Sequence, residues 1–314
     1  SGYTLGENPQ AEAIARQTWA NVANAVSEFE KVSMVVNPGD QAHAKKLLSS
    51  EVELVELPLN DAWMRDIGPT FVLNDAGELG AVDWVFNGWG AQKWAQWDKD
   101  SQIAKYISEI AGATHLPSTL INEGGGIHVS DSSVVLLTET VQQGEGRNAT
   151  LSKLEIEKEI HDKLGTSQAV WIKRGLTRDY DEFGTRGHID IVACFAPGNI
   201  VLYHDQPNPN HPDHQVSKEV REVFMRAGFE TIAINAPEVL KDQEGFVDYS
   251  YINHYVVNNG VILCGFNDPK DKEAKAKIRE AYPGREVVLV DATELFARGG
   301  GIHCITQQQP KAIR

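Results

Sequence analysis

The sequence predicts an α/β fold made of repeated ββαβ units, and three observations favour it. The string GGGIH occurs twice, at 124–128 and at 299–303. Helices followed by short strands separate a series of predicted hairpins. The motifs at the hairpin starts recur at roughly 50 to 65 residues, a period typical of repeated units that pack on their neighbours, and they contain Asp66, Glu123, His188, Asn253 and Cys304. Five such units closing in a ring would bring every motif to one central axis.

Four hairpins are predicted from pairs of apolar runs. Between the two runs of each pair stand turn residues such as Asn, Asp, Gly, Pro and Ser, which favour a reversal of the chain. The predicted strand pairs are Thr70–Leu73 with Leu79–Val85, Ile127–Val129 with Val134–Leu137, Ile189–Phe195 with Ile200–Tyr203, and Tyr251–Val257 with Val261–Cys264.

Apolar residues at helical spacing predict the helices between these hairpins. In one of them, Ile156, Ile160 and Leu164 stand one turn apart. The predicted helices are Ala11–Phe29, Gln41–Ser49, Lys99–Ala111, Leu151–Leu164, Val216–Ala227 and Lys270–Ala281. A short strand is predicted after each helix, at Val32–Val36, Val52–Leu57, Thr114–Leu116, Ala169–Lys173, Glu230–Ile234 and Glu286–Val290.

Length and composition favour one catalytic domain over residues 1–314, and the opening indicates that a short segment precedes residue 1. The formal charge of −15 argues against nucleic acid as a partner, since nucleic-acid binding needs clustered Lys and Arg. No apolar stretch approaches the roughly 20 residues of a membrane-spanning helix. The three cysteines are widely spaced, which favours free thiols over disulfides. Cys194 and Cys264 lie in apolar strand runs and are predicted to be buried core residues.

Cys304 is the candidate nucleophile. It follows Gly299, Gly300 and Gly301, where a backbone without Cβ atoms lets a ligand approach closely. Val129 stands at the corresponding place after the first GGGIH copy, so the scaffold does not require sulfur there. The alternative is that Cys304 is a small buried apolar residue, as most free cysteines are.

His188 and Asp190 are predicted to face one side of an alternating strand. Thiol catalysis needs a group that transfers protons beside the nucleophile, and His188 fits that need. Asp66 and Glu123 start other units, although each of them could also serve only to shape its loop. Carboxylates accept the fixed fork of guanidinium N–H donors bidentately, so this set points to a cationic planar substrate attacked by a thiolate at its central carbon.

At these residues the sequence resembles the agmatine deiminase branch of the guanidino-group-modifying enzymes, which is related to the bacterial peptidylarginine deiminases. The matching strings spread over nearly the whole chain: WMRDIGPTFV at 63–72, FNGWG at 86–90, NEGGGIHV at 122–129, GHID at 187–190 and GGGIHCITQQQP at 299–310. The resemblance implies a five-bladed, pseudo-symmetric α/β-propeller, the pentein fold, in agreement with the repeat count.

The resemblance also implies a role for each residue. Cys304 resembles the nucleophile, and His188 resembles the general acid and base. Asp66 and Asp190 look like the guanidinium clamp, while Glu123 is similar to the carboxylate that contacts the guanidinium and steadies the histidine. Gly299, Gly300 and Gly301 resemble the approach to the nucleophile. No metal or organic cofactor is implied.

Three residues are candidates to lie near the tail of the substrate. Trp63 and Trp89 stand beside the motifs and are candidates to flank an aliphatic chain. Arg186 departs from the acidic stretch that many agmatine deiminases carry before the catalytic histidine. If Arg186 faced the pocket it would repel an ammonium group and attract a carboxylate. Alternatively it points outward into a salt bridge with Asp179, Asp181 or Glu182.

The function expected from these residues is hydrolysis of agmatine to N-carbamoylputrescine and ammonia, a step toward putrescine. Deimination of a guanidino acid or of a peptidyl-arginine is the enzymatic alternative, and a propeller that binds a partner without catalysis is the third. The expected partner is a small cationic guanidino compound, with no nucleic acid and no membrane. The free thiols favour a cytoplasmic location. A homodimer or a higher homo-oligomer stays open.

Overall fold

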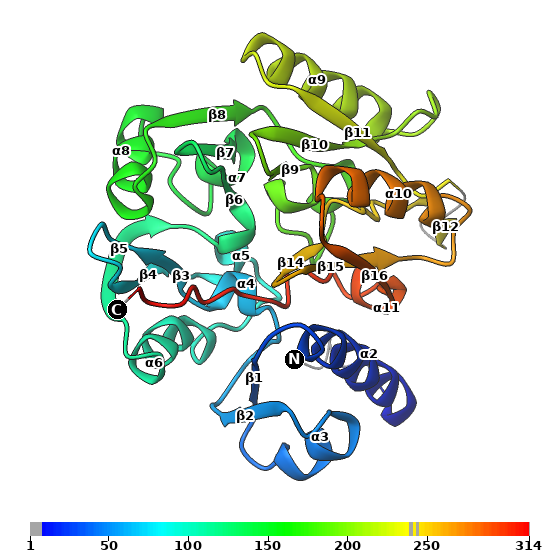
Figure 1. Cartoon of the computed structure of the whole chain (residues 1–314). Helices are drawn as coiled ribbons and strands as arrows, with labels where there is room; N and C mark the ends of the chain where they lie inside the picture. Colours follow the sequence, from blue (N-terminus) through cyan, green and yellow to red (C-terminus); the bar gives the residue numbers. More distant parts are fainter. Residues whose placement is uncertain (1–7, 239–240, 243–244, 314) are drawn as a thin grey trace.

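The computed structural model describes residues 8–238, 241–242 and 245–313, and it shows a mixed α/β fold whose sheets surround a common centre (Figure 1). Four three-stranded sheets repeat one pattern among these residues. The first two strands of each sheet are antiparallel, and the third strand pairs in parallel with the middle one. The four sheets are β3 (Thr70–Leu73), β4 (Leu79–Val85) and β5 (Thr114–Ile121); β6 (Ile127–Val129), β7 (Val134–Thr138) and β8 (Gln168–Ile172); β9 (Ala193–Ala196), β10 (Ile200–Asp205) and β11 (Thr231–Asn235); and β14 (Tyr255–Val257), β15 (Gly260–Gly265) and β16 (Glu286–Asp291).

A fifth unit consists of the parallel pair β1 (Val32–Val36) and β2 (Val52–Glu56), which registers Val32 with Val52. A small two-stranded ribbon, β12 (Lys241–Asp242) and β13 (Gly245–Phe246), lies outside this repeat. The predicted ββαβ order is therefore present in four units of the described chain, and in the fifth only the parallel pair is regular.

Helices connect the strands of each parallel pair, because parallel neighbours cannot be joined by a tight turn. They are α3 (Gln41–Leu47), α6 (Ile103–Ile110), α8 (Lys153–Leu164), α9 (Asp213–Arg226) and α10 (Asp271–Ala281). The longest helix, α2 (Pro9–Ser27), precedes β1. The shorter helical segments are α4 (Met64–Ile67), α5 (Gly88–Ala91), α7 (Glu139–Gln142), α11 (Thr293–Phe296), η1 (Asp100–Gln102), η2 (Gly124–Gly126), η3 (Thr177–Tyr180) and η4 (Ile189–Ile191).

Helix α8 shows why these helices form where the sequence predicts them. Ser152 and Glu155 make a reciprocal capping box at its start, and Gly165 ends it in the left-handed conformation with φ 66°. Ile156 and Ile160, one turn apart, are fully buried against the neighbouring sheets. The helix therefore turns one apolar face to the core and its charged residues to the surface.

Two predicted strands are wrong in part. Residues 189–195 were expected to form one strand, but Ile189–Ile191 form the 3₁₀ turn η4 and β9 begins only at Ala193. Likewise only Tyr255–Val257 of the expected run 251–257 is a strand. Both runs consist mainly of apolar residues and are buried at every position except Val256, and a buried turn cannot be told from a buried strand by periodicity alone.

The second GGGIH copy also differs from the first. Its residues form a turn, whereas the first copy passes through η2 into β6. Its carbonyl and amide groups are instead tied to neighbouring units: Arg65 Nε donates to His303 O at 3.3 Å, and His303 N donates to Asn253 Oδ1 at 2.9 Å. The identical pentapeptide is therefore bent to place the residue that follows it at the centre.

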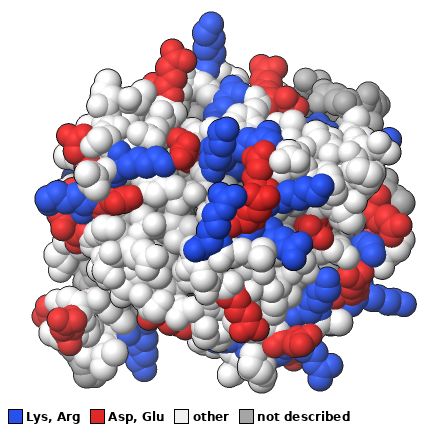
Figure 2. All heavy atoms as spheres, turned by 90° about the horizontal axis from the view of Figure 1, so that it is seen from above, with Lys and Arg blue, Asp and Glu red and all other residues white. Residues whose placement is uncertain are grey.

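No helix among the described residues is long and apolar enough to cross a membrane. The sequence carries 44 acidic against 29 basic residues. On the face seen from above, basic and acidic side chains are interspersed (Figure 2). That face therefore does not carry the continuous basic patch that nucleic acids require.

Candidate active site

The predicted catalytic residues converge at the common centre of the sheets, where they lie in turns and short helices. They come from four different units: Asp66 from α4, Glu123 from the residue before η2, His188 and Asp190 from η4 and its N-cap, and Cys304 from the turn after the second GGGIH copy. All five side chains are buried. The sequence therefore predicted correctly which polar residues meet.

A cavity of about 500 Å³ opens beside this cluster. His188, Asp190, Cys304 and the glycines Gly299 and Gly300 line its floor. The loop that ends at His188 contributes one wall. A smaller hollow adjoins it, lined by Trp63, Asp66, Trp89, Trp94, Phe183 and Cys304. Cys304 belongs to both, so a ligand that spans the two hollows would pass over its sulfur.

Asp66 is held rigidly by two donors. Gly125 N donates to its Oδ1 at 3.0 Å and Trp89 Nε1 donates to its Oδ2 at 2.8 Å. Burial raises the pKa of Asp66 to about 6, although the His188 charge opposes that rise. Gly125 must lack a side chain, because a Cβ there would lie 2.5 Å from His188 Nδ1 and 2.9 Å from Asp66 Oδ1. The glycine run thus lets the clamp and the histidine approach each other.

Glu123 and Arg147 form an ion pair beneath His188 that is almost completely buried. Arg147 Nε lies 3.0 Å from both Glu123 oxygens, and His188 Nε2 lies 3.3 Å from Oε2. Burial alone would raise the pKa of Glu123, but Arg147 and His188 lower it below its ordinary value. Burial alone would lower the pKa of His188, but Asp66, Glu123 and Asp190 together raise it to about 9. His188 is therefore an imidazolium at neutral pH.

Arg147 was missed by the sequence analysis. Its string Gly144-Glu145-Gly146-Arg147 matches no mechanistic motif, and an arginine in a loop is usually solvated. The side chain is nevertheless buried, and its Nη2 also donates to Thr185 O at 2.8 Å. Sequence gives no signal for such a partner until the fold places it under Glu123.

Asn253 supports the nucleophile. Its Nδ2 lies 3.3 Å from Cys304 Sγ, and its Oδ1 accepts from His303 N at 2.9 Å. A Cβ at Gly301 would lie 2.3 Å from Asn253 Oδ1, so this glycine permits the contact from behind and does not line the cavity. The repeat had marked Asn253 as the fifth motif position, and the structure brings it to the same cluster as the other four.

Cys304 is a thiol in the unliganded site. Burial, and then the negative charges of Asp190 and Asp66, raise its pKa well above its ordinary value. Asp190 Oδ2 is 3.5 Å from the sulfur. A cation placed between these carboxylates would reverse the electrostatic part of that effect.

Two buried polar atoms of the cluster have no hydrogen-bond partner among the described residues, His188 Nδ1 and Asp190 Oδ1. Buried polar atoms are rarely left unsatisfied, and the exceptions mark functional sites. His188 Nδ1 is 3.9 Å from Asp66 Oδ1. An N–H of the imidazolium and a carboxylate oxygen are therefore available to a ligand beside the sulfur.

Known proteins with similar sequences identify the family to which this chain belongs. The model of the Porphyromonas-type peptidyl-arginine deiminases matches residues 6–310. The chain belongs to that family. A Streptomyces coelicolor protein named "Putative agmatine deiminase" is 54% identical over 306 residues, which cover 95% of this chain and 90% of the relative.

Solved structures of the family agree with the fold. The agmatine deiminase of Enterococcus faecalis superposes with a TM-score of 0.89 at 30% identity, over 97% of this chain and 89% of the other. The C. jejuni agmatine deiminase with substrate bound gives 0.89 at 25% identity, over 98% of this chain and 90% of the other.

In this family member the loop from Asp179 to His188 is organised by one buried carboxylate. Asp179 accepts hydrogen bonds from Thr185 N, Thr185 Oγ1, Gly187 N and His188 N, at 2.6 to 3.1 Å. Asp179 was considered only as a partner for Arg186. Its position nine residues before the histidine fits a loop-closing role, which a short polar side chain performs through backbone amides.

Arg186 takes neither of the two positions expected for it. It is not among the residues that line the cavity, and its guanidinium donates to Gln92 Oε1 at 3.0 Å and to Tyr180 O. Asp179, Asp181 and Glu182 do not pair with it, because the loop has turned its backbone to φ 74° and directed the side chain toward α5. Arg186 thus braces the wall of the cavity from outside.

Aromatic side chains form the other wall. Trp89 stacks on Trp94 with ring centroids 5.4 Å apart, and Trp94 meets Phe183 edge-on at 5.1 Å. Trp63 and Trp89 both line the small hollow. Trp89 has a second task, since its indole N–H holds Asp66.

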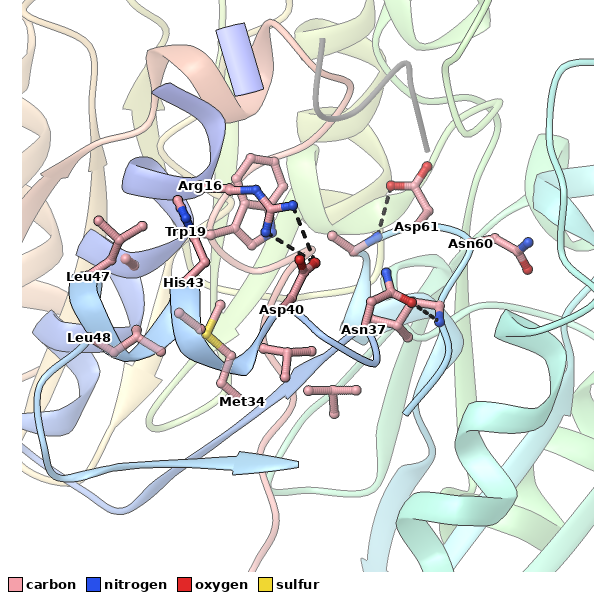
Figure 3. A pocket seen from close by; sticks show the side chains of 16 residues that line it. Arg16, Trp19, Met34, Asn37, Asp40, His43, Leu47, Leu48, Asn60 and Asp61 are labelled. Carbon is pink, nitrogen blue, oxygen red and sulfur yellow. Dashed lines mark hydrogen bonds and ion pairs between the residues drawn. The ribbon is translucent and has the colours of Figure 1, made fainter. Parts of the chain in front are cut away.

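Trp63 is in turn supported by Trp19 of α2, whose ring lies 5.8 Å away. Trp19 also lines an apolar pocket of about 130 Å³ between α2, α3 and β1. Figure 3 shows Arg16 at its rim, paired with Asp40 at 3.2 Å. None of the five candidate catalytic residues lines this pocket. Its connection to the site is Trp19, which packs against Trp63.

Proposed function

We propose that the protein hydrolyses agmatine to N-carbamoylputrescine and ammonia through a covalent intermediate on Cys304. The observation that carries this proposal is the convergence of a thiol, an imidazolium and carboxylates in one buried site that leaves His188 Nδ1 and Asp190 Oδ1 without partners. The family membership and the names of the relatives support it.

A guanidinium fits the clamp. Asp66 and Asp190 offer carboxylate oxygens beside Cys304, and an ionised carboxylate accepts two N–H donors of the planar fork. A desolvated carboxylate oxygen without a hydrogen-bond partner, such as Oδ1 of Asp190, gains most from such a cation. The charge of the bound guanidinium then opposes the effect of the two acids on the thiol and lowers the pKa of Cys304, so that the thiol loses its proton to solvent and the thiolate forms in the complex.

The thiolate attacks the guanidinium carbon and gives a tetrahedral adduct. The His188 imidazolium donates its proton to the departing nitrogen, and ammonia leaves with the bond to carbon broken. A thiouronium remains on Cys304. The neutral His188 then removes a proton from water as the water oxygen attacks the same carbon. The C–S bond breaks as the remaining hydroxyl proton passes to the sulfur, which releases the neutral ureido product and restores the Cys304 thiol.

The walls of the cavity favour an amine tail. Asp181, Glu182 and Asp248 line it with one basic neighbour, Arg178. Burial, and then Asp179 and Asp213, raise the pKa of Asp248 to about 7. A cationic tail would stabilise the ionised form of Asp248, whereas a carboxylate tail would meet like charges. With Arg186 directed away, agmatine is preferred over a guanidino acid or a peptidyl-arginine.

The test is ammonia release from agmatine, with free arginine, 4-guanidinobutyrate and an arginine-containing peptide in parallel. Cys304→Ser serves as the folded, inactive control. Agmatine should be turned over with the highest kcat/KM. Release from only one of the other compounds would keep the mechanism and replace the substrate. No release from any of them by a folded wild-type protein would remove the deiminase function and leave the non-catalytic alternative.

We also propose that the sheet units close into a five-bladed propeller, and that residues 1–314 act as one catalytic domain. The arrangement of the units around one centre and the contact of Arg65 N with Cys304 O support this closure. We propose a cytoplasmic location on the basis of the free, buried cysteines. Whether the protein forms a homo-oligomer is tested by measuring its mass in solution.

A further inference from the structure

Asp190 stands between two cavities. One is the substrate cavity described above. The other, here called the rear cavity, has a volume of about 400 Å³ and is lined by His128, His254, His303, Tyr255, Tyr282 and Arg285, among others. Among the described residues Asp190 is the one that lines both. A group in the rear cavity can therefore touch the clamp without meeting the substrate.

His303 makes that contact. Its Nδ1 lies 2.7 Å from Asp190 Oδ2, the shortest contact of that carboxylate with a side chain. The other oxygen, Oδ1, has no hydrogen-bond partner. The two oxygens of Asp190 thus have different surroundings. Oδ2 contacts His303 on the side of the rear cavity, and Oδ1 is available to a ligand.

The backbone of His303 is fixed as well. Its N–H donates to Asn253 Oδ1 at 2.9 Å, and its carbonyl accepts from Arg65 Nε at 3.3 Å. The ring therefore approaches Asp190 from a clamped backbone, next in the chain to the nucleophile. A shift of His303 would move Asp190 and Cys304 together.

The internal repeat supplies a comparison within the molecule. His128 ends the first GGGIH copy as His303 ends the second, and the two rings face each other with centroids 6.3 Å apart. His128 Nδ1, however, accepts from Phe195 N at 3.2 Å and so carries no proton. In the first copy of the pentapeptide the histidine contacts a backbone amide, whereas in the second copy the histidine contacts the carboxylate of Asp190.

On the deiminase function proposed above, we propose that His303 is a positioning residue for Asp190. As a neutral imidazole it donates its Nδ1–H to Oδ2, which keeps Asp190 ionised and turns Oδ1 toward the guanidinium. Burial, and then the charges of Arg65 and His188 and the nearby His254, lower the pKa of His303 well below its ordinary value and support the neutral form. The rear cavity holds no acid within the described residues other than Asp131 and Asp190.

Three variants test the role. His303→Leu removes the donor, and kcat/KM for agmatine should fall about 10- to 100-fold, the effect of losing one hydrogen bond to a charged group. Its acid limb should move above that of wild type, because Asp190 loses the donor that favours its charge and, like Asp66, must be ionised to hold the guanidinium. His303→Asn places an amide N–H near the position of Nδ1 and should restore both. His128→Asn, in the same cavity but away from Asp190, should match wild type.

A second readout does not need turnover. In the ¹⁵N-histidine NMR spectrum of the resting protein, assigned with His303→Asn, His303 should be the Nδ1–H tautomer. An Nε2–H tautomer would overturn the proposal, as would a folded His303→Leu variant with wild-type kcat/KM and acid limb, or an equal loss in His128→Asn. If wild type releases ammonia from no guanidine, the proposed deiminase function is wrong. The tautomer of His303 still tests separately whether its Nδ1–H donates to Asp190.

Discussion

At the scale of single residues, each reacting group is held by a partner that lies behind it. Arg147 donates a hydrogen bond to Glu123, Trp89 donates one to Asp66, and Asn253 donates one to Cys304. Low dielectric strengthens each such contact and makes each unpaired partner costly. Which of these side chains converge was predictable from the sequence, because the motifs that hold Asp66, Glu123, His188 and Cys304 recur at the repeat period. Their partners were not, because nothing local marks the residue that the fold will place beneath them.

The pH dependence follows from two of these residues. Asp66 must be ionised to hold the guanidinium, and its pKa is about 6, so kcat/KM should fall as the pH drops below that value. His188 must carry a proton to release ammonia, and its pKa is about 9, so kcat/KM should fall as the pH rises above that value. Initial rates between pH 5 and 10 in constant ionic strength check this. An acid limb near the ordinary carboxyl pKa of roughly 4 would contradict it.

Arg147 can be tested apart from the chemistry. Arg147→Met should destabilise the protein by about 3 to 5 kcal/mol, because it leaves Glu123 buried without its partner. The double change Glu123→Gln with Arg147→Met should regain most of that stability while kcat stays low, since His188 loses its carboxylate. Thermal and urea unfolding measure the first effect and ammonia release the second.

The matched control for this pair is Arg226→Met, which removes an exposed ion pair with Glu222. It should change stability by less than about 1 kcal/mol. If Arg147→Met proved as mild as this control, the buried pair would not be the support of His188.

At the scale of elements, the crossover helices were the easiest part to predict. Helix α8 follows the expected bounds within two residues at its start, because its capping box and C-terminal glycine are local signals. The start of α9 was predicted three residues too late, at Val216, whereas the helix begins at Asp213 directly after Pro212 at its N-cap. Near the centre the predictions failed, for η4 replaces a strand. Several turns meet there, and their shape depends on neighbours from other units.

Helix α2 connects this scale to the site. Trp19→Ala should remove the ring that supports Trp63 and destabilise the protein by about 2 to 3 kcal/mol, less than for a fully buried tryptophan. KM for agmatine should rise several-fold as Trp63 loosens, with a smaller change in kcat. Ile14→Ala on the exposed face of the same helix is the control and should change neither. A destabilised Trp19→Ala variant with unchanged KM would separate α2 from the substrate wall.

At the scale of the whole molecule, net charge acts on the encounter with substrate. The formal charge of −15 attracts a dication such as agmatine, and this attraction is screened over roughly 10 Å at 0.1 M salt. Raising NaCl from 10 to 200 mM should therefore lower kcat/KM for agmatine several-fold. The same salt should affect a zwitterionic guanidine such as arginine less, measured by turnover or by competition. Equal effects on both would show that the overall charge does not steer binding.

The contact between Arg65 and the second GGGIH segment has a consequence for how the protein is made. Arg65 donates to His303 O, Gln307 and Gln308, across 238 to 243 residues of sequence. Such distant contacts form late, because a long loop must close first. During synthesis on the ribosome, Asp66, His188 and Asp190 emerge well before Cys304. A nascent chain can thus fold most of its sheets while it is still unable to react, and the thiol reaches its acids only in the last step of assembly.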